Sequence, residues 1–233
     1  MVCHGRAQLS ESRSLKIVFI GPPGSGKSTQ ASFVCEAFGI PQVSTGDMLR
    51  AAMRDRTPIG LQVEKDMHAG NLISDEIVIG LAKHRLCEAD CANGFLLDGF
   101  PRTLNQAQVM HSSGIAVDYV IEFDVPDSEI VGRMGGRRVH PPSGRSYHIL
   151  HNPPREGGFD DVTGEPLVLR DDDRVAVVLH RLSLYYAESS PVGKFYADWY
   201  CSEEGSPTYL KVNGMGAISD IRAMIFSALR QPV

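Results

Sequence analysis

The sequence predicts an α/β protein with a three-layer core, in which a parallel β-sheet is covered by helices on both faces. Apolar runs of strand length alternate with stretches of helical periodicity, a pattern typical of this class. The first run, residues 15–20, leads directly into a glycine-rich loop that opens a helix. A segment at 139–169, rich in proline and glycine, breaks the alternation and predicts a small β-rich insert.

Size and composition are those of a globular enzyme. The 233 residues suffice for one sizeable domain, with 42% hydrophobic and 22% charged residues. No apolar run approaches the ~20 residues of a membrane span, and the net charge of −5 gives no indication of nucleic-acid binding. We expect neither a membrane nor a nucleic acid as partner. Five scattered cysteines argue against a disulfide framework.

The strands are expected where apolar residues run without alternation, as in strands buried on both faces. The expected strands are 15–20, 95–100, 119–125 and 208–212, and residues 41–44 could form a shorter one.

The helices are expected between these strands, and several carry end signals. Gly39 suits the residue after a helix, and Ser74 suits an N-cap. Thr103 and Gln106 match a capping box, and Pro126 suits a first helical position. The expected helices are 26–38, 47–55, 60–70, 74–89, 103–114, 126–138, 171–190, 192–205 and one from about 219 onward.

Residues 1–14 precede the first strand and form an expected N-terminal tail. They are too polar for the apolar core of a signal peptide. We therefore expect a cytoplasmic protein. Arginine, histidine and serine in the tail leave a mitochondrial or other organellar location as the alternative.

The glycine-rich loop is the clearest functional signal. Residues 21–28, GPPGSGKS, fit the pattern G-x-x-x-x-G-K-[ST] after a strand and before a helix. Glycines allow several backbone N–H groups to face one point, and the helix N-terminus adds partial positive charge. Lys27 adds a full charge that can follow a phosphate. The loop predicts binding of the phosphates of a nucleoside triphosphate.

A second signal is the run NGFLLDGFPR at residues 93–102. An apolar strand ending in Asp98 is typical of the acid that holds Mg²⁺, directly or through water, although a strand can also end in an aspartate that only makes a turn. Arg102 follows at the carboxyl end of this strand, where ligands of α/β proteins bind.

Arginine dominates the cationic residues, with 17 Arg and 6 Lys. Its planar fork binds phosphate in a bidentate manner, but a high genomic GC content would produce the same bias. Individual arginines therefore need positional arguments.

Four motifs in order, GPPGSGKSTQ, VSTGDMLRAA, NGFLLDGFPRT and GRRVHPPSGRSYH, closely resemble adenylate kinase of the long-lid type. The similarity runs from about residue 15 to the C-terminus. It implies a core with two mobile inserts, one over AMP and one over ATP. The implied parts are a core of 15–43, 74–135 and 174–233, an AMP-binding insert at 44–73 and a lid at 136–173.

The resemblance also implies site residues. The implied ATP-binding residues are Gly24, Ser25, Gly26, Lys27, Ser28, Thr29, Arg133, Arg137, Ser146, Tyr147 and Gly216. The implied AMP-binding residues are Thr45, Arg50, Asn71, Leu72, Ile73, Gly99, Phe100, Pro101, Arg102, Gln106, Arg170 and Arg181. The implied catalytic residues are Lys27, Arg102, Arg137, Arg170 and Arg181. Asp98 and Ser28 would hold Mg²⁺, and Asp172 matches a position associated with lid closure.

Spacing adds to two of these assignments. Arg133 and Arg137 are four residues apart, so on one helix they would point to the same ligand. Arg170 precedes a helix on which Arg181 lies about three turns later, so the two could share a side.

Gln106 has two interpretations. It completes a capping box with Thr103, and it matches the family's adenine-reading glutamine, since an amide can pair with a purine edge through both donor and acceptor. We favour the second.

The lid raises the question of a metal. Some relatives hold it with a four-cysteine zinc site, but the corresponding residues here are His140, Ser143, Asp160 and Thr163. Hydroxyls and one carboxylate are poor zinc ligands and a good hydrogen-bond network. We expect no structural zinc.

The expected function is reversible phosphoryl transfer, MgATP + AMP ⇌ 2 ADP, by a monomer that serves adenine nucleotide homeostasis. Mg²⁺ is the expected cofactor, and ATP, AMP and ADP are the expected small-molecule partners. The alternatives are a GTP:AMP kinase, a uridylate/cytidylate kinase or a nucleotide-controlled switch.

Overall fold

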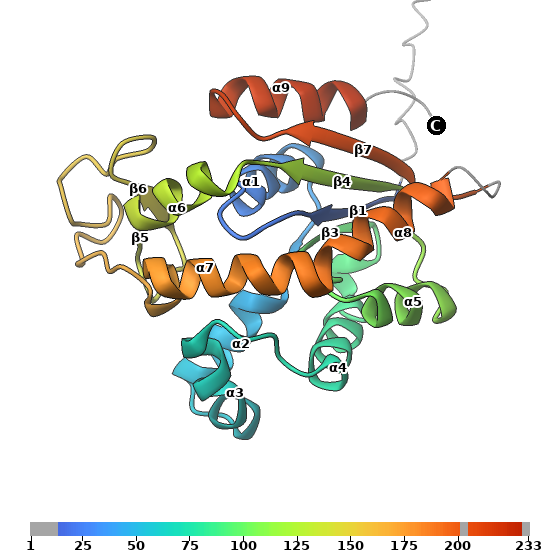
Figure 1. Cartoon of the computed structure of the whole chain (residues 1–233), viewed down its shortest axis with the longest axis horizontal. Helices are drawn as coiled ribbons and strands as arrows, with labels where there is room; N and C mark the ends of the chain where they lie inside the picture. The colour runs from blue at the N-terminus through green and yellow to red at the C-terminus, as the bar shows by residue number, and fades with distance from the viewer. Residues whose placement is uncertain (1–13, 201–204, 230–233) are drawn as a thin grey trace, which may run out of the picture.

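A computed structural model describes residues 14–200 and 205–229, and its centre is a five-stranded parallel sheet (Figure 1). The strands are β1 (Leu15–Ile20), β2 (Gln42–Ser44), β3 (Gly94–Asp98), β4 (Tyr119–Asp124) and β7 (Thr208–Asn213). Their order is β2-β3-β1-β4-β7. The chain leaves β1 and β3 toward opposite sides of the sheet, so their carboxyl ends border the crevice in which α/β proteins bind ligands.

Helices cover both faces of the sheet, which confirms the predicted fold class. The helices are α1 (Lys27–Phe38), α2 (Thr45–Arg54), α3 (Pro58–Ala69), α4 (Asp75–Leu86), α5 (Leu104–Ser112), α6 (Asp127–Gly136), α7 (Val175–Leu184), α8 (Ser190–Tyr200) and α9 (Ile218–Leu229). Residues of α1 and α9 pack in one apolar cluster, and residues of α4, α5 and α8 pack in the other.

Strand β1 shows why a continuous apolar run is needed. Ile17 and Phe19 pack on the face covered by α1 and α9, whereas Val18 and Ile20 pack on the opposite face. Alternate side chains of a strand point to opposite faces, so both sets must be apolar. Burying each such side chain contributes roughly 1.5–3 kcal/mol. This packing holds the strand rigid beneath the loop that follows it.

Three predicted helix-end signals differ from what the structure shows. Ser74 occupies the N-cap position of α4, but its hydroxyl accepts no capping hydrogen bond. Thr103 caps α5 by accepting from the backbone N–H of Gln106 at 3.1 Å, yet the Gln106 carbonyl accepts from Arg102 instead of completing the box. Pro126 is the N-cap of α6 and not its first residue, because the backbone of Pro126 is extended.

The helix predicted over 171–190 is divided. A 3₁₀ turn at Asp171–Asp173 precedes α7, and a π-helical turn at Tyr185–Ser189 leads into α8. Pro191 lacks the N–H that would bond to the carbonyl four residues earlier, and its ring crowds that carbonyl. A π turn is one way for a helix to continue past such an interruption.

The segment predicted to be β-rich has little regular structure. Strands β5 (Arg137–Val139) and β6 (Ser146–His148) pair antiparallel, and the rest is held by isolated bridges such as Val139 with Val168. Within it, Pro166 and Val168 make isolated bridges and do not form a strand. In Figure 1 this segment lies as loops at one end of the sheet, beyond α6 and α7. The boundaries of both inserts stay predictions.

Among the described residues, no helix has both the length and the apolar character to cross a membrane. Apart from Ser14, the predicted tail lies outside the described residues, so the cellular location stays a prediction.

Candidate active site

The glycine-rich loop curls over the N-terminus of α1. Gly21, Gly24 and Gly26 have φ angles of 139°, 75° and 93°, which L side chains rarely adopt. A Cβ on Gly24 would also lie 2.8 Å from the sulfur of Met134. Only glycine lets the loop bend this tightly at the positive end of a helix, which is the geometry of an anion site.

Lys27 lies within the loop. Its Nζ donates to the carbonyls of Gly21 at 2.8 Å and Pro22 at 2.6 Å, and to Ser25 Oγ at 3.2 Å. Burial lowers the pKa of Lys27 to about 7, Asp98 opposes the shift, and nearby arginines add to it. The acceptors of Lys27 Nζ are neutral oxygens, and a bound polyphosphate would give the ammonium group a negatively charged partner.

Ser28, in the first turn of α1, meets the end of β3. Its Oγ donates to Asp98 Oδ2 at 2.6 Å, and Gln42 Nε2 donates to the same oxygen at 2.9 Å. Asp98 is 4% exposed. Hydroxyl and carboxylate oxygens are the ligands that Mg²⁺ prefers, so this pair fits that ion.

The loop opens into a central cavity with a large excess of positive charge. Of the residues that the structure describes, six cationic side chains and the carboxylates of Asp98 and Asp172 line it. The cations are Lys27, Arg50, Arg102, Arg137, Arg170 and Arg181. They come from the start of α1, from α2, from the segment after β3, from the two residues flanking the 139–169 segment, and from α7.

The arginines repel one another in this cavity. Burial and the neighbouring guanidinium groups lower the pKa values of Arg102 and Arg170 to about 10 each. Such a cluster favours a ligand with several negative charges.

Two arginines are held by carboxylates. Arg137 donates from Nε to Asp173 Oδ2 at 2.7 Å, and a second bond joins the same pair. Burial would lower the pKa of Arg137, but the bonds to Asp173 raise it. Arg181 donates to Asp172 Oδ2 at 2.7 Å. These bonds fix the direction in which each guanidinium points.

A second, smaller cavity adjoins the first. Arg50, Arg102, Arg181, Gly46, Gly70, Leu72 and Asp172 line both cavities. The smaller one is further lined by Thr45, Leu49, Met67, Asn71, Ile73, Val78 and Gln106. Its wall thus combines apolar side chains with amide and hydroxyl groups, and arginines stand at the junction of the two cavities.

Similarity to a known protein family adds evidence about the nature of this site. A family model described as adenylate kinase matches residues 19–200, more than half of the chain. The chain belongs to the adenylate kinase family. Adenylate kinases are phosphotransferases that act on nucleoside monophosphates, and this one carries the family's phosphate loop on its first strand.

The structure corrects one expectation about this adenylate kinase. Arg133 and Arg137 were predicted on one helix face, but α6 ends at Gly136 and Arg137 begins β5. Gly135 and Gly136, poor helix formers, precede the extended backbone of Arg137. Arg137 lines the central cavity, whereas Arg133 donates to Glu129 and to the carbonyl of Gly214.

Several predicted residues of the adenylate kinase lie outside both cavities. They are Ser25, Gly26, Thr29, Phe100, Arg133, Ser146, Tyr147 and Gly216. Ser25 and Phe100 are buried beside the cavities, and Gly26 caps α1. Tyr147 turns its hydroxyl toward Asp160. Roles for these residues in nucleotide binding stay predictions.

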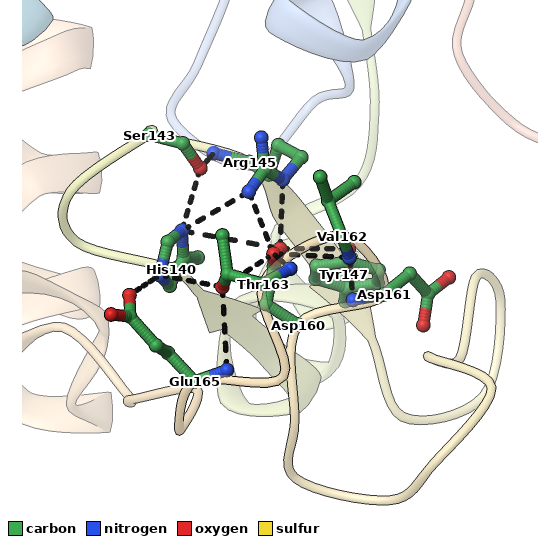
Figure 2. Close-up of polar contacts among 9 residues, drawn as sticks. All are labelled: His140, Ser143, Arg145, Tyr147, Asp160, Asp161, Val162, Thr163 and Glu165. Carbon is green, nitrogen blue, oxygen red and sulfur yellow. Dashed lines mark hydrogen bonds and ion pairs between the residues drawn. The ribbon is translucent and has the colours of Figure 1, made fainter.

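The four residues of the predicted lid that correspond to the relatives' zinc site lie in one hydrogen-bond network, as expected (Figure 2). His140 Nδ1 lies 2.7 Å from Ser143 Oγ, and Thr163 Oγ1 donates to Asp160 at 3.0 Å. Arg145 donates to both oxygens of Asp160 and, with other donors, holds the pKa of that carboxyl well below its usual range.

Metal binding by the lid is a separate matter. Through the described part of the chain, no group of three or more His, Cys, Asp or Glu side chains is placed to hold a metal ion. That zinc has no structural role here stays a prediction.

Three residues of the adenylate kinase site were missed in the sequence. Asp173 orients Arg137, and the run of three aspartates after Arg170 was its signal. Asp75 contacts Gln106, but the sequence alone did not indicate this. An acidic residue at the start of a helix is equally explained by its favourable interaction with the helix dipole. Tyr185 lines the central cavity and begins the π turn, which no sequence pattern predicted.

Proposed function

We propose that this adenylate kinase family member catalyses the reversible reaction MgATP + AMP ⇌ 2 ADP. The observation that carries the proposal is the junction of the two cavities. One cavity begins at the phosphate loop, the other has several apolar side chains in its wall, and Arg50, Arg102 and Arg181 line both. Two nucleotides bound there would face each other through their phosphates, with guanidinium groups between them.

The chain's own groups supply what the reaction needs. Phosphoryl transfer requires two anions in line and neutralisation of the migrating charge. Lys27 and the loop hold the triphosphate, and Arg102, Arg137, Arg170 and Arg181 neutralise charge from other sides. The phosphate oxygen of AMP is already anionic, so the mechanism needs no general base.

Mg²⁺ is the proposed cofactor. Ser28 Oγ and the Asp98 carboxylate would hold it, directly or through water, beside the loop. When bound, Mg²⁺ offsets phosphate charge during transfer.

AMP is the proposed acceptor and occupies the smaller cavity. Thr45, Asn71, Leu72, Ile73 and Gln106 line this cavity, and Arg50 reaches it from α2. Apolar groups such as Leu49 and Val78 would cover a purine ring. The segment from Gly99 to Arg102 connects this cavity to the end of β3, and Arg102 Nε donates to the carbonyl of Gly99 at 2.7 Å.

Two contacts link the proposed AMP-binding insert to the segments across the site. His180 Nε2, on α7, lies 2.8 Å from Asn71 Oδ1, and Arg170, in the proposed lid, lies 3.9 Å from Asp47. Closure of these segments over the nucleotides would exclude water, so that the phosphoryl group reaches AMP and is not hydrolysed. We propose a long-lid kinase that works as a monomer in the cytoplasm.

A panel of acceptors and donors tests this function. Purified protein is supplied with Mg²⁺ and ATP or GTP, together with AMP, GMP, UMP or CMP, and diphosphate formation is measured. The proposal expects ATP with AMP to be the fastest pair. A faster rate with UMP or CMP, or hydrolysis that no acceptor accelerates, would contradict it.

A further inference from the structure

The amide of Gln106 is held in one orientation by groups behind the smaller cavity. Gln106 is 2% exposed. Its Nε2 donates to Asp75 Oδ1 at 2.7 Å, and its Oε1 accepts from the backbone N–H of Arg102 at 2.7 Å. A carboxylate accepts hydrogen bonds and a backbone N–H donates them. Reversing the amide would therefore place donor against donor and acceptor against acceptor.

Asp75 is itself held in place. Its two oxygens each lie 3.0 Å from the Thr103 hydroxyl, and Asn105 Nδ2 donates to Oδ2 at 2.7 Å. Asp75 is also the first residue of α4, where the helix dipole favours a negative charge. The carboxylate thus ties the start of α4 to the start of α5 and presents a fixed acceptor to Gln106.

These contacts leave the amide with a defined pattern. One N–H on Nε2 and one lone pair on Oε1 stay available, and Gln106 lines the smaller cavity. The Watson–Crick edge of adenine offers an acceptor, N1, beside an amino donor. The same edge of hypoxanthine or guanine offers an N–H donor beside a carbonyl acceptor. The fixed amide complements adenine and opposes the other two bases.

We propose that Asp75 is a positioning residue that sets the base selectivity of the monophosphate site through Gln106. Asp75 lines neither cavity, so it acts on the base through the amide and not by contact. The inference rests on the proposed function, in which the smaller cavity binds AMP.

The test compares AMP with inosine monophosphate (IMP), which carries hypoxanthine. Asp75→Asn keeps the shape of the side chain but can offer an N–H to Gln106, which removes one of the two mismatches of the reversed amide and leaves only the one with the Arg102 N–H. The preference of Gln106 for its present orientation is therefore weakened. We expect the ratio of kcat/KM for AMP to that for IMP to fall roughly tenfold, the scale of one mispaired hydrogen bond. The KM for ATP should stay unchanged. Glu76→Gln, exposed on the same helical turn, removes the same charge and should keep the ratio.

Two further variants separate positioning from general structural damage. Asp75→Ser also removes the carboxylate and retains a residue favoured at helix starts, so it tests selectivity if Asp75→Asn folds poorly. In a Gln106→Ala background, Asp75→Asn should leave the AMP to IMP ratio unchanged. An unchanged ratio in both folded single variants would overturn the inference while leaving AMP transfer intact. Absence of AMP transfer in the wild type would instead overturn the proposed function.

Discussion

Ser28 Oγ donates a 2.6 Å hydrogen bond to Asp98 Oδ2, which joins the first turn of α1 to the end of β3. The two residues are far apart in the sequence, and parallel pairing of β1 with β3 brings them together. Their oxygens lie beside the loop that carries Lys27.

Removing the Ser28 hydroxyl should weaken the response to Mg²⁺. In Ser28→Ala, we expect the Mg²⁺ concentration for half-maximal transfer to rise about tenfold, the scale found when an orienting group of a metal site is lost. Ser32→Ala is the matched control, because Ser32 lies one turn later on α1 and its hydroxyl donates to the backbone carbonyl of Ser28. Transfer rates are measured across a Mg²⁺ titration. Equal titration curves for the two variants would contradict the assignment.

ATP binding should be accompanied by proton uptake at Lys27. In the free protein the pKa of Lys27 is lowered to about 7, chiefly by burial, so the amine is mostly neutral at about pH 8. The triphosphate raises this pKa because it stabilises the ammonium form. Calorimetry in buffers of different ionisation enthalpy should show uptake of up to about one proton at that pH.

The same experiment on Lys27→Met should show little uptake, and Lys194→Met should show the wild-type value. Lys194 is an exposed residue of α8 that pairs with Asp198. Uptake that persists in Lys27→Met would place the proton elsewhere.

The Arg181 guanidinium should act mainly on the transfer step. Arg181→Lys keeps a charge but loses the planar fork that can bridge two phosphates. We expect kcat to fall roughly 100-fold, while the ATP dissociation constant changes much less. Arg174→Lys, a 70% exposed side chain at the start of α7, should retain kcat within about twofold. A fall in kcat of the same size in both variants would contradict a specific role.

Asp160 should stabilise the 139–169 segment in a pH-dependent manner. Hydrogen bonds from Arg145 and other donors lower its pKa in the folded protein. A lowered carboxyl pKa contributes stability above the unfolded pKa of about 4, and this stability is lost as the pH falls through the folded value. Asp160→Asn should lower the melting temperature by about 5 °C near neutral pH.

Its neighbour provides the control for that variant. Asp161 lies beside Arg155, which is 88% exposed, so Asp161→Asn should cost less. The difference between wild type and Asp160→Asn should shrink as the pH is lowered below about 4. A constant difference from neutral to acidic pH would show that ionisation of Asp160 is not involved.

The sequence predicted those parts of the fold that depend on local chemistry. Continuous apolar runs predicted four of the five strands of the sheet, and the short fifth, β2, was only suggested by residues 41–44. Positive φ angles at Gly24 and Gly26 explain why the loop needs glycines at fixed spacing. The Asp98 position followed from the end of an apolar strand. These predictions agree with the structure because each feature is determined by residues within a few positions of one another.

Other features depend on contacts between distant segments. The pairing of Arg137 with Asp173 spans 36 residues, and nothing near Arg137 marks its partner. Of the two interpretations of Gln106, the capping box is not completed, because its side-chain oxygen accepts from the backbone N–H of Arg102 instead. Asp75 looked like an ordinary first-turn acid. The hydrogen-bond partners of these side chains are set by tertiary contacts, which the pattern of a single sequence does not predict.

The most direct test of the central claim is ³¹P NMR of a mixture of ATP, AMP and Mg²⁺ with the purified protein. The adjoining cavities predict that ATP and AMP disappear together in equal amounts, that ADP accumulates, and that inorganic phosphate does not. Release of inorganic phosphate from ATP while AMP stays constant would contradict the account.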